Sequence, residues 1–211
     1  MKIIPVILEP TPEKTQEKLD KLIGVCDSVQ IDVVDTYFAN NETISVGGIK
    51  KLRTQISYVL HLMVNLADNN LLDKFLETQA SGLTIYKRAV DNLSGAISKI
   101  KASGKKVGLA LDIEDEVDEV EGILDRLDFV LVMGVPTGFA GQKFKEEVLP
   151  KISAIHSYLP DLEVGIDGGV DENIIKLARA EGADFVCTNT HFWTGDDPKD
   201  RFLKLSRLAS L

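Results

Sequence analysis

Eight short apolar runs, rich in β-branched residues, recur along the chain and have the length and composition of buried β-strands. Between many of them lie charged stretches whose apolar residues are spaced as on one face of a helix. This alternation predicts a strand followed by a helix, repeated through the chain. The predicted strands are Ile3–Leu8, Val29–Val34, Tyr58–Val64, Leu83–Tyr86, Val107–Leu111, Phe129–Met133, Val164–Ile166 and Phe185–Cys187. The predicted helices include Glu13–Ile23, Leu71–Gln79, Asn92–Lys101, Val117–Leu127, Glu146–Tyr158 and Asn173–Ala180.

Strands that alternate with helices run parallel, because each crossover returns the chain to the same end of the sheet. Eight such units match a (β/α)₈ barrel, whereas a doubly wound sheet usually has fewer strands and a glycine-rich first turn. The first turn here reads LEPTPE, which is neither a dinucleotide-binding fingerprint nor a P-loop. We therefore predict an α/β protein, a single-domain (β/α)₈ TIM barrel over residues 1–211.

Composition and charge narrow the class of function. The chain has 211 residues, of which 44% are hydrophobic and 27% charged, as in an ordinary globular protein. Its net charge of −9 disfavours nucleic acids and anionic lipid as partners. No run approaches the roughly 20 apolar residues of a membrane span, and the first run is interrupted by Pro5 and ended by Glu9. Cys26 and Cys187 fit no disulfide framework or zinc motif, so we expect a soluble cytoplasmic protein.

The active site of such a barrel lies at the carboxyl ends of its strands, so polar residues there are candidates for chemistry. In the segment VQIDVVD, Gln30 and Asp32 lie two residues apart on one strand and point to the same side. Burying an unpartnered carboxylate costs several kcal/mol. We therefore expect Asp32 to meet a metal, a cation or a substrate.

Two further polar residues interrupt apolar runs. His61 lies within the run YVLHLMVN, with Met63 on the same face; a single histidine in that setting is more often a partnered core residue than a ligand. Asp167 ends the seventh run and is followed by Gly168 and Gly169, which allow the backbone to approach a ligand closely. An equally good interpretation of Asp167 is a turn that caps the next helix.

Five segments in this order, IDVVD, HLMV, KVGLALD, VLVMGVPTGFAGQKF and VGIDGGVDENI, resemble the ribulose-phosphate 3-epimerase family, and the similarity runs from the first strand to the last helix. That family has a (β/α)₈ barrel in which two histidines and two aspartates hold a divalent metal. The aspartates also act as acid and base and invert the carbon next to the ketone of a pentulose 5-phosphate. The resemblance thus implies an isomerase of carbohydrate metabolism, in the pentose phosphate pathway.

Transferred residue by residue, the resemblance assigns the acid/base roles to Asp32 and Asp167 and a metal-binding role to both aspartates and His61. The fourth metal ligand, a histidine in the family, is Gln30 here. Gln30 could offer its amide oxygen, a weaker ligand for borderline metals, so we expect weaker binding or a shift toward a harder ion. Two other family positions differ in this chain: a serine is Val6 and a histidine is Tyr86.

The resemblance also implies a binding site for the substrate and its phosphate. The family's glycine-rich loop after the sixth strand is nearly intact, but a Gly-Ser pair after the eighth strand is replaced by Thr188 and Asn189, which leaves phosphate binding altered. The candidate binding residues are Met63, Gly138, Phe139, Ala140, Gly141, Gly168, Gly169, Thr188 and Asn189.

The leading hypothesis is an epimerase that interconverts D-ribulose 5-phosphate and D-xylulose 5-phosphate. The resemblance implies one divalent ion (Zn²⁺, Fe²⁺, Mn²⁺ or Co²⁺) and a phosphorylated ketose as the ligand. Homo-oligomers are common in the family, so a homo-oligomer is a further expectation. One alternative is an epimerase of another ketose phosphate such as allulose 6-phosphate. Another is an epimerase-like barrel that has lost catalysis and serves in binding or regulation. Related decarboxylases and aldolases with a D-x-K-x-x-D strand are disfavoured, because Val34 and Tyr37 replace the lysine and second aspartate.

Overall fold

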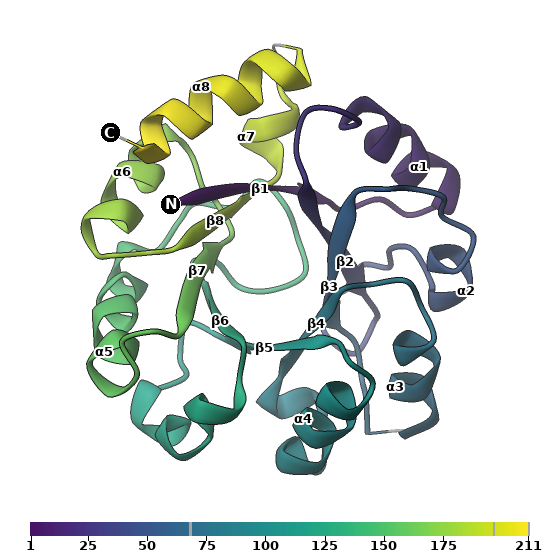
Figure 1. The fold of residues 1–211 in the computed structure, drawn as a ribbon, viewed down its shortest axis with the longest axis vertical. Coiled ribbons are helices and arrows are strands. Elements are labelled where there is room, and N and C mark those ends of the chain that lie inside the picture. Colours follow the sequence, from purple (N-terminus) through teal and green to yellow (C-terminus); the bar gives the residue numbers. More distant parts are fainter. Residues whose placement is uncertain (68, 196, 211) are drawn as a thin grey trace.

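The protein is described by a computed structural model covering residues 1–67, 69–195 and 197–210. Eight parallel strands close into a barrel in sequence order, since β1 pairs with both β2 and β8 (Figure 1). This confirms the predicted (β/α)₈ barrel. The strands are β1 (Lys2–Ile7), β2 (Ser28–Val34), β3 (Ser57–Met63), β4 (Gly82–Tyr86), β5 (Lys106–Leu111), β6 (Phe129–Met133), β7 (Glu163–Asp167) and β8 (Phe185–Thr188).

Helices surround the ring of strands (Figure 1). Their ends follow local chemistry: α1 begins at Pro12, whose missing N–H is not needed there, and Thr11 accepts a hydrogen bond from the Lys14 N–H. Asp171 caps α6 by accepting from the backbone N–H groups of the helix's first turn. The α-helices are α1 (Pro12–Lys21), α2 (Val46–Ile49), α3 (Asn69–Leu76), α4 (Leu93–Ala102), α5 (Pro150–Tyr158), α6 (Glu172–Ala180), α7 (Thr190–Trp193) and α8 (Pro198–Ser210).

The connection between β5 and β6 differs from the sequence-based expectation. The segment Val117–Leu127 was expected to be a helix, but it forms two 3₁₀ segments, Val117–Glu119 and Glu121–Arg126. Gly122 and the β-branched valines weaken an α-helix, and acidic residues at helical spacing repel one another. A 3₁₀ turn, Glu146–Val148, likewise precedes α5, so the α-helical part of that predicted segment begins only at Pro150.

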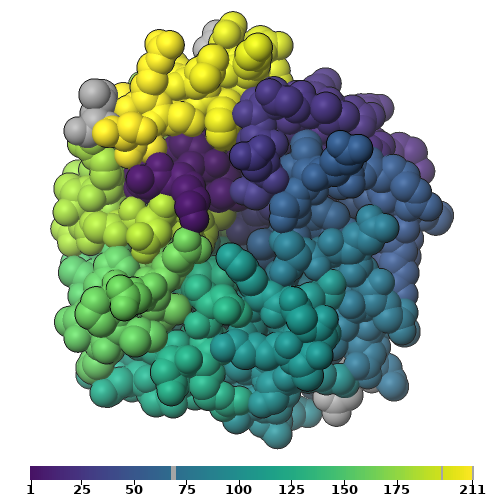
Figure 2. Space-filling model, in the orientation of Figure 1, coloured from purple at the N-terminus to yellow at the C-terminus, as the bar shows by residue number. Residues whose placement is uncertain are grey.

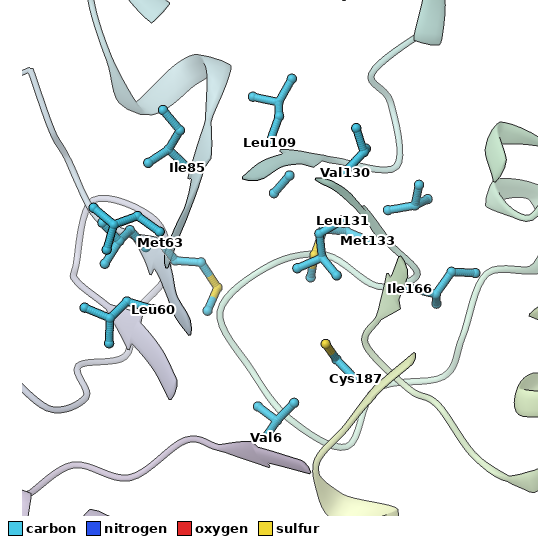
Figure 3. Close-up of a cluster of buried hydrophobic side chains, with 14 of the residues drawn as sticks. Val6, Leu60, Met63, Ile85, Leu109, Val130, Leu131, Met133, Ile166 and Cys187 are labelled. Atoms are coloured by element: carbon cyan, nitrogen blue, oxygen red, sulfur yellow. The ribbon is translucent and has the colours of Figure 1, made fainter. Parts of the chain in front are cut away.

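Side chains alternate between the inside and the outside of the barrel. Figure 3 shows the sulfur atoms of Met63, Met133 and Cys187 directed into the barrel, while Leu60 and Ile166 point outward toward the helices. The centre of the molecule is filled by atoms, with no open channel in the view of Figure 2. The barrel is therefore a packed core that supports a site at one end. None of the helices in the described part of the chain combines the length and apolar character needed to cross a bilayer.

Candidate active site

Three of the polar residues singled out in the sequence meet inside the barrel. Asp32 on β2 lies beside His61 on β3 in the strand register, and Asp167 ends β7 next to Met133 of β6. One ligand atom from each of Asp32, His61 and Asp167 lies within 4.8 Å of the others, and all three residues are buried. Asp171 is the cap of α6, which removes the interpretation of Asp167 as the helix cap. The barrel thus gathers two acids and an imidazole from distant parts of the sequence.

Gln30 joins this group from β2, with its amide nitrogen facing the acids. Gln30 Nε2 donates to Asp32 Oδ1 at 2.8 Å and to Asp167 Oδ2 at 2.6 Å, and it lies 3.2 Å from His61 Nδ1. The amide oxygen points the other way and accepts from Cys187 Sγ at 3.3 Å. The inward direction of Gln30 follows the strand pattern, but the sequence analysis anticipated the oxygen, not the nitrogen, at the acids.

His61 is held on its second nitrogen by Tyr86. His61 Nε2 lies 2.8 Å from Tyr86 Oη, and the two rings stack at 5.5 Å between centroids. Tyr86 is fully buried, and burial raises the pKa of its phenol well above the usual range, so the hydroxyl keeps its proton. His61 is therefore both a partnered core residue and a candidate ligand, because Nδ1 faces Asp32 at 3.2 Å.

Burial and a neighbouring carboxylate control the charge of Asp167. Burial, followed by the negative charge of Asp32, raises the pKa of the Asp167 carboxyl to about 6. Burial alone would lower the pKa of His61, but its hydrogen bond to Asp32 and the charges of both aspartates raise that pKa instead. Near neutral pH Asp167 and His61 therefore bind protons more readily than ordinary aspartate and histidine side chains do, and they can still release them.

A pocket with a volume of about 220 Å³ opens above these residues. Asp32, His61 and Asp167 form part of its lining, whereas Gln30, two residues before Asp32 on β2, is not in the lining and lies beneath it. The candidate binding residues that line the pocket are Met63, Gly138, Phe139, Ala140, Gly141, Gly168, Gly169 and Asn189. Thr188 is placed differently: its side chain is buried in the wall, where its hydroxyl donates to the Val170 carbonyl at 3.2 Å.

The loop after β6 forms one side of the pocket and crosses the barrel end to the opposite side of the ring (Figure 1). The Asn41 side chain, in the loop after β2, donates to the Gly138 carbonyl at 3.0 Å. A Cβ atom at Gly138 would lie 2.1 Å from the Cβ of Ala39. Glycine at this position therefore permits the contact between the two loops.

The glycines after β7 permit an equally close approach. Gly169 has φ +66°, and a Cβ atom there would lie 2.7 Å from the Gln142 carbonyl oxygen. The Gly168 N–H donates to Asp167 Oδ1 at 2.6 Å and so positions that carboxylate. These two glycines connect the acid to the loop after β6.

The pocket lining also includes residues that were not among the sequence-based candidates, for example Thr137, Gln142, Thr190 and His191. Thr190 and His191 begin α7, one residue beyond Asn189 at the carboxyl end of β8, where barrel sites form, and that position was the signal available for them. Gln142 had a weaker signal, as it ends the glycine-rich segment. His191 Nε2 lies 3.7 Å from Glu172 Oε1 of α6, which is beyond hydrogen-bond distance.

Three of the four polar side chains that meet here are suitable ligands for a divalent cation. Two carboxylate oxygens and an imidazole nitrogen at this spacing are ligands that Zn²⁺, Fe²⁺, Mn²⁺ and Co²⁺ accept. Asp32, His61 and Asp167 would hold such an ion. Gln30 presents two N–H groups to the same point, so it is not a ligand in this orientation.

Comparison with known proteins gives one consistent result. Residues 2–193 match the model of the ribulose-phosphate 3 epimerase family. The chain is 32% identical to a ribulose-phosphate 3-epimerase of Mycobacterium tuberculosis over 193 residues, 89% of this chain and 84% of the relative. It is 32% identical to one of Bacillus subtilis over 183 residues, 83% of this chain and 84% of the relative. It is 29% identical to the cytoplasmic isoform of Oryza sativa over 204 residues, 93% of this chain and 89% of the relative.

Solved structures share the fold at lower identity. The 3-hexulose-6-phosphate synthase of Salmonella typhimurium superposes with a TM-score of 0.74 at 18% identity, covering 100% of this chain and 99% of that one. Orotidine 5′-phosphate decarboxylase of Pyrococcus horikoshii gives a TM-score of 0.68 at 10% identity, covering 99% of each chain. At these identities the match concerns the barrel architecture.

Proposed function

Because the chain belongs to the ribulose-phosphate 3-epimerase family, we propose that it is an isomerase that interconverts D-ribulose 5-phosphate and D-xylulose 5-phosphate. The observation that carries the proposal is the convergence of Asp32 and Asp167, from well-separated strands of the ring, at the base of one small pocket. Inversion next to a ketone needs one group to remove a proton from carbon and another to return a proton to the opposite face. Two carboxyls approaching from different sides of the barrel suit this task.

The environments of the two acids support a division of roles. Asp167, whose pKa is raised to about 6, holds a proton near neutral pH more readily than an ordinary carboxyl does. In one direction Asp32 takes the proton from carbon and Asp167 returns one to the other face; in the reverse direction the roles exchange. A divalent ion held by Asp32, His61 and Asp167 would polarise the ketone and stabilise the negative charge of the enediolate.

The phosphate of the substrate is assigned to the glycine-rich end of the pocket. Gly141 and Gly169 both adopt positive φ, which exposes backbone at this end, and Asn189 adds a side-chain amide. The Gly168 N–H already binds Asp167, so the phosphate donors are expected from the neighbouring residues. Thr190 and His191 complete this side of the pocket.

The test is an epimerase assay on the purified protein with D-ribulose 5-phosphate, with and without added Mn²⁺, Zn²⁺, Co²⁺ or Fe²⁺. Formation of D-xylulose 5-phosphate, and exchange of the carbon-bound proton with deuterated solvent by NMR, are expected. Asp32→Asn and Asp167→Asn should each lower the rate by roughly 10²–10⁴-fold. Asp161→Asn, the same change at an exposed site, is the matched control.

Absence of both product and deuterium exchange with every metal would refute the proposal. Turnover of allulose 6-phosphate in place of the pentulose phosphate would keep the reaction class and change the substrate. Unchanged rates in both aspartate variants would refute the assignment of the acid and base.

A further inference from the structure

The amide group of Gln30 occupies the point toward which the two acids and the imidazole converge. Its nitrogen lies 2.8 Å from Asp32 Oδ1, 2.6 Å from Asp167 Oδ2 and 3.2 Å from His61 Nδ1. An amide nitrogen carries two hydrogens and no available lone pair. Each hydrogen therefore has one carboxylate oxygen to bind, and the two acids are linked through one neutral group.

The orientation of this amide is fixed from its other end. Gln30 Oε1 accepts a hydrogen bond from Cys187 Sγ at 3.3 Å. Burial raises the pKa of the Cys187 thiol well above its usual range, so the sulfur keeps the proton that it donates. Turning the amide over would place its oxygen within 2.8 Å of two carboxylate oxygens, where acceptors face acceptors. Only the observed orientation gives hydrogen-bond partners to both the nitrogen and the oxygen of the Gln30 amide.

The remaining polar atoms close the network in the same state. Both Gln30 hydrogens are used by the acids, so His61 Nδ1 can donate its own proton to Asp32 Oδ1 at 3.2 Å. Its Nε2 then has the Tyr86 hydroxyl at 2.8 Å. His61, Gln30, Asp32 and Asp167 are between 0 and 6% exposed, and a buried polar network of this kind is stable only when its members are satisfied.

We propose that the amide nitrogen of Gln30 takes the place of a cation between Asp32 and Asp167 and holds these two carboxyl groups together without a metal. A divalent ion then binds only after the amide turns away from the acids. Gln30 acts as a positioning residue, since it lies beneath the pocket and works through the acids. This inference shares Asp32 and Asp167 with the proposed function but does not require that they catalyse a reaction.

Substitution of this one residue tests the proposal on the full-length protein. Gln30→Glu has the same shape but removes both hydrogen-bond donors and adds a third carboxylate. Gln30→His removes the bridge and supplies an imidazole ligand. Gln55→Glu, the same chemical change at an exposed position, is the control. Each protein is stripped with a chelator, and its Tm and its affinity for Mn²⁺, Zn²⁺ and Co²⁺ are measured by calorimetry.

The wild type and Gln55→Glu should keep their Tm within about 1 °C after stripping, because the amide bridge needs no ion. Gln30→Glu should lose roughly 5 °C or more when stripped and regain it with metal, because three buried carboxylates repel one another without a cation. Gln30→His should bind the same ions at least about tenfold more tightly than the wild type.

Two results would overturn the proposal: a wild-type Tm that falls on stripping as far as that of Gln30→His, or equal metal affinity of these two proteins. If Gln30→Glu does not fold, the wild type and Gln30→His still supply both comparisons. Turnover is measured separately. Loss of activity in every protein with the expected Tm and affinity pattern would refute the proposed function and leave the amide bridge standing.

Discussion

Replacing Tyr86 with phenylalanine removes one hydroxyl group and leaves the ring in place. The ring packs against Phe38 at 5.1 Å and stacks on His61 at 5.5 Å between centroids, and Tyr86→Phe preserves both contacts. What is lost is the 2.8 Å hydrogen bond to His61 Nε2. Because His61 is 0% exposed, water cannot replace the hydroxyl without a cavity to hold it.

The cost of the change is the cost of leaving a buried nitrogen without a partner. Such a loss amounts to about 1–3 kcal/mol for a neutral group and more for a charged one. The pKa of His61 is raised by the aspartates, which places the cost toward the upper end near neutral pH. At this chain length roughly 2–4 °C of Tm corresponds to each kcal/mol, so we expect a Tm lowered by about 2–12 °C.

Urea denaturation of the wild type and Tyr86→Phe measures the difference in the free energy of unfolding directly. Tyr37→Phe is the matched control, since Tyr37 is 57% exposed and its hydroxyl can bind water in both states. An unfolding free energy of Tyr86→Phe equal to that of the control would refute the reasoning that His61 depends on this hydroxyl.

Three further predictions address the pocket loops and the charge of the acids. Gly169→Ala should destabilise the protein by roughly 2–4 kcal/mol in urea denaturation, because φ is +66° and the new methyl group would lie 2.7 Å from the Gln142 carbonyl oxygen; a stable variant would contradict the close packing. For the chelator-treated protein, burial and the charge of Asp32 raise the pKa of Asp167 in the folded state to about 6, above the ordinary value of about 4 in the unfolded chain. The contribution of Asp167 to stability is therefore fully present below about pH 4 and is lost as the pH rises to about 6; Asp167→Asn should flatten this part of the pH profile of stability. Arg88→Ala should raise the KM for the sugar phosphate several-fold, since Arg88 donates to the Thr137 hydroxyl at 2.8 Å and steadies the pocket loop; an unchanged KM would show that this contact does not order the loop.

Strand positions were predictable because each is a short buried run flanked by turn residues. Phe129–Met133 matches β6 at both ends, and the other strands differ at their ends by one residue. The predicted helix over Val117–Leu127 failed, since periodicity alone does not weigh Gly122 against the helical pattern. The short helices α2 and α7 have too few residues to produce a periodic signal.

Within the candidate site, the sequence identified the residues better than their orientations. Asp32 and His61 follow from strand periodicity, and their contact follows from parallel pairing of neighbouring strands. The direction of the Gln30 amide depends on Asp167 of β7 and Cys187 of β8, which are remote in the sequence, so no local pattern encodes it. The difference between buried Thr188 and pocket-lining Asn189 likewise depends on where β8 ends.

The buried thiol of Cys187 allows the interior of the barrel to be labelled with a thiol reagent. An alkylating reagent reaches this sulfur poorly in the closed barrel, because the residue lines the pocket but is only 1% exposed and its high pKa keeps the unreactive thiol form. Cys26 is half-buried outside that interior and supplies a second thiol on the same chain for comparison. The labelling rate at Cys187 therefore reports how often the pocket opens far enough to admit the reagent to its lining.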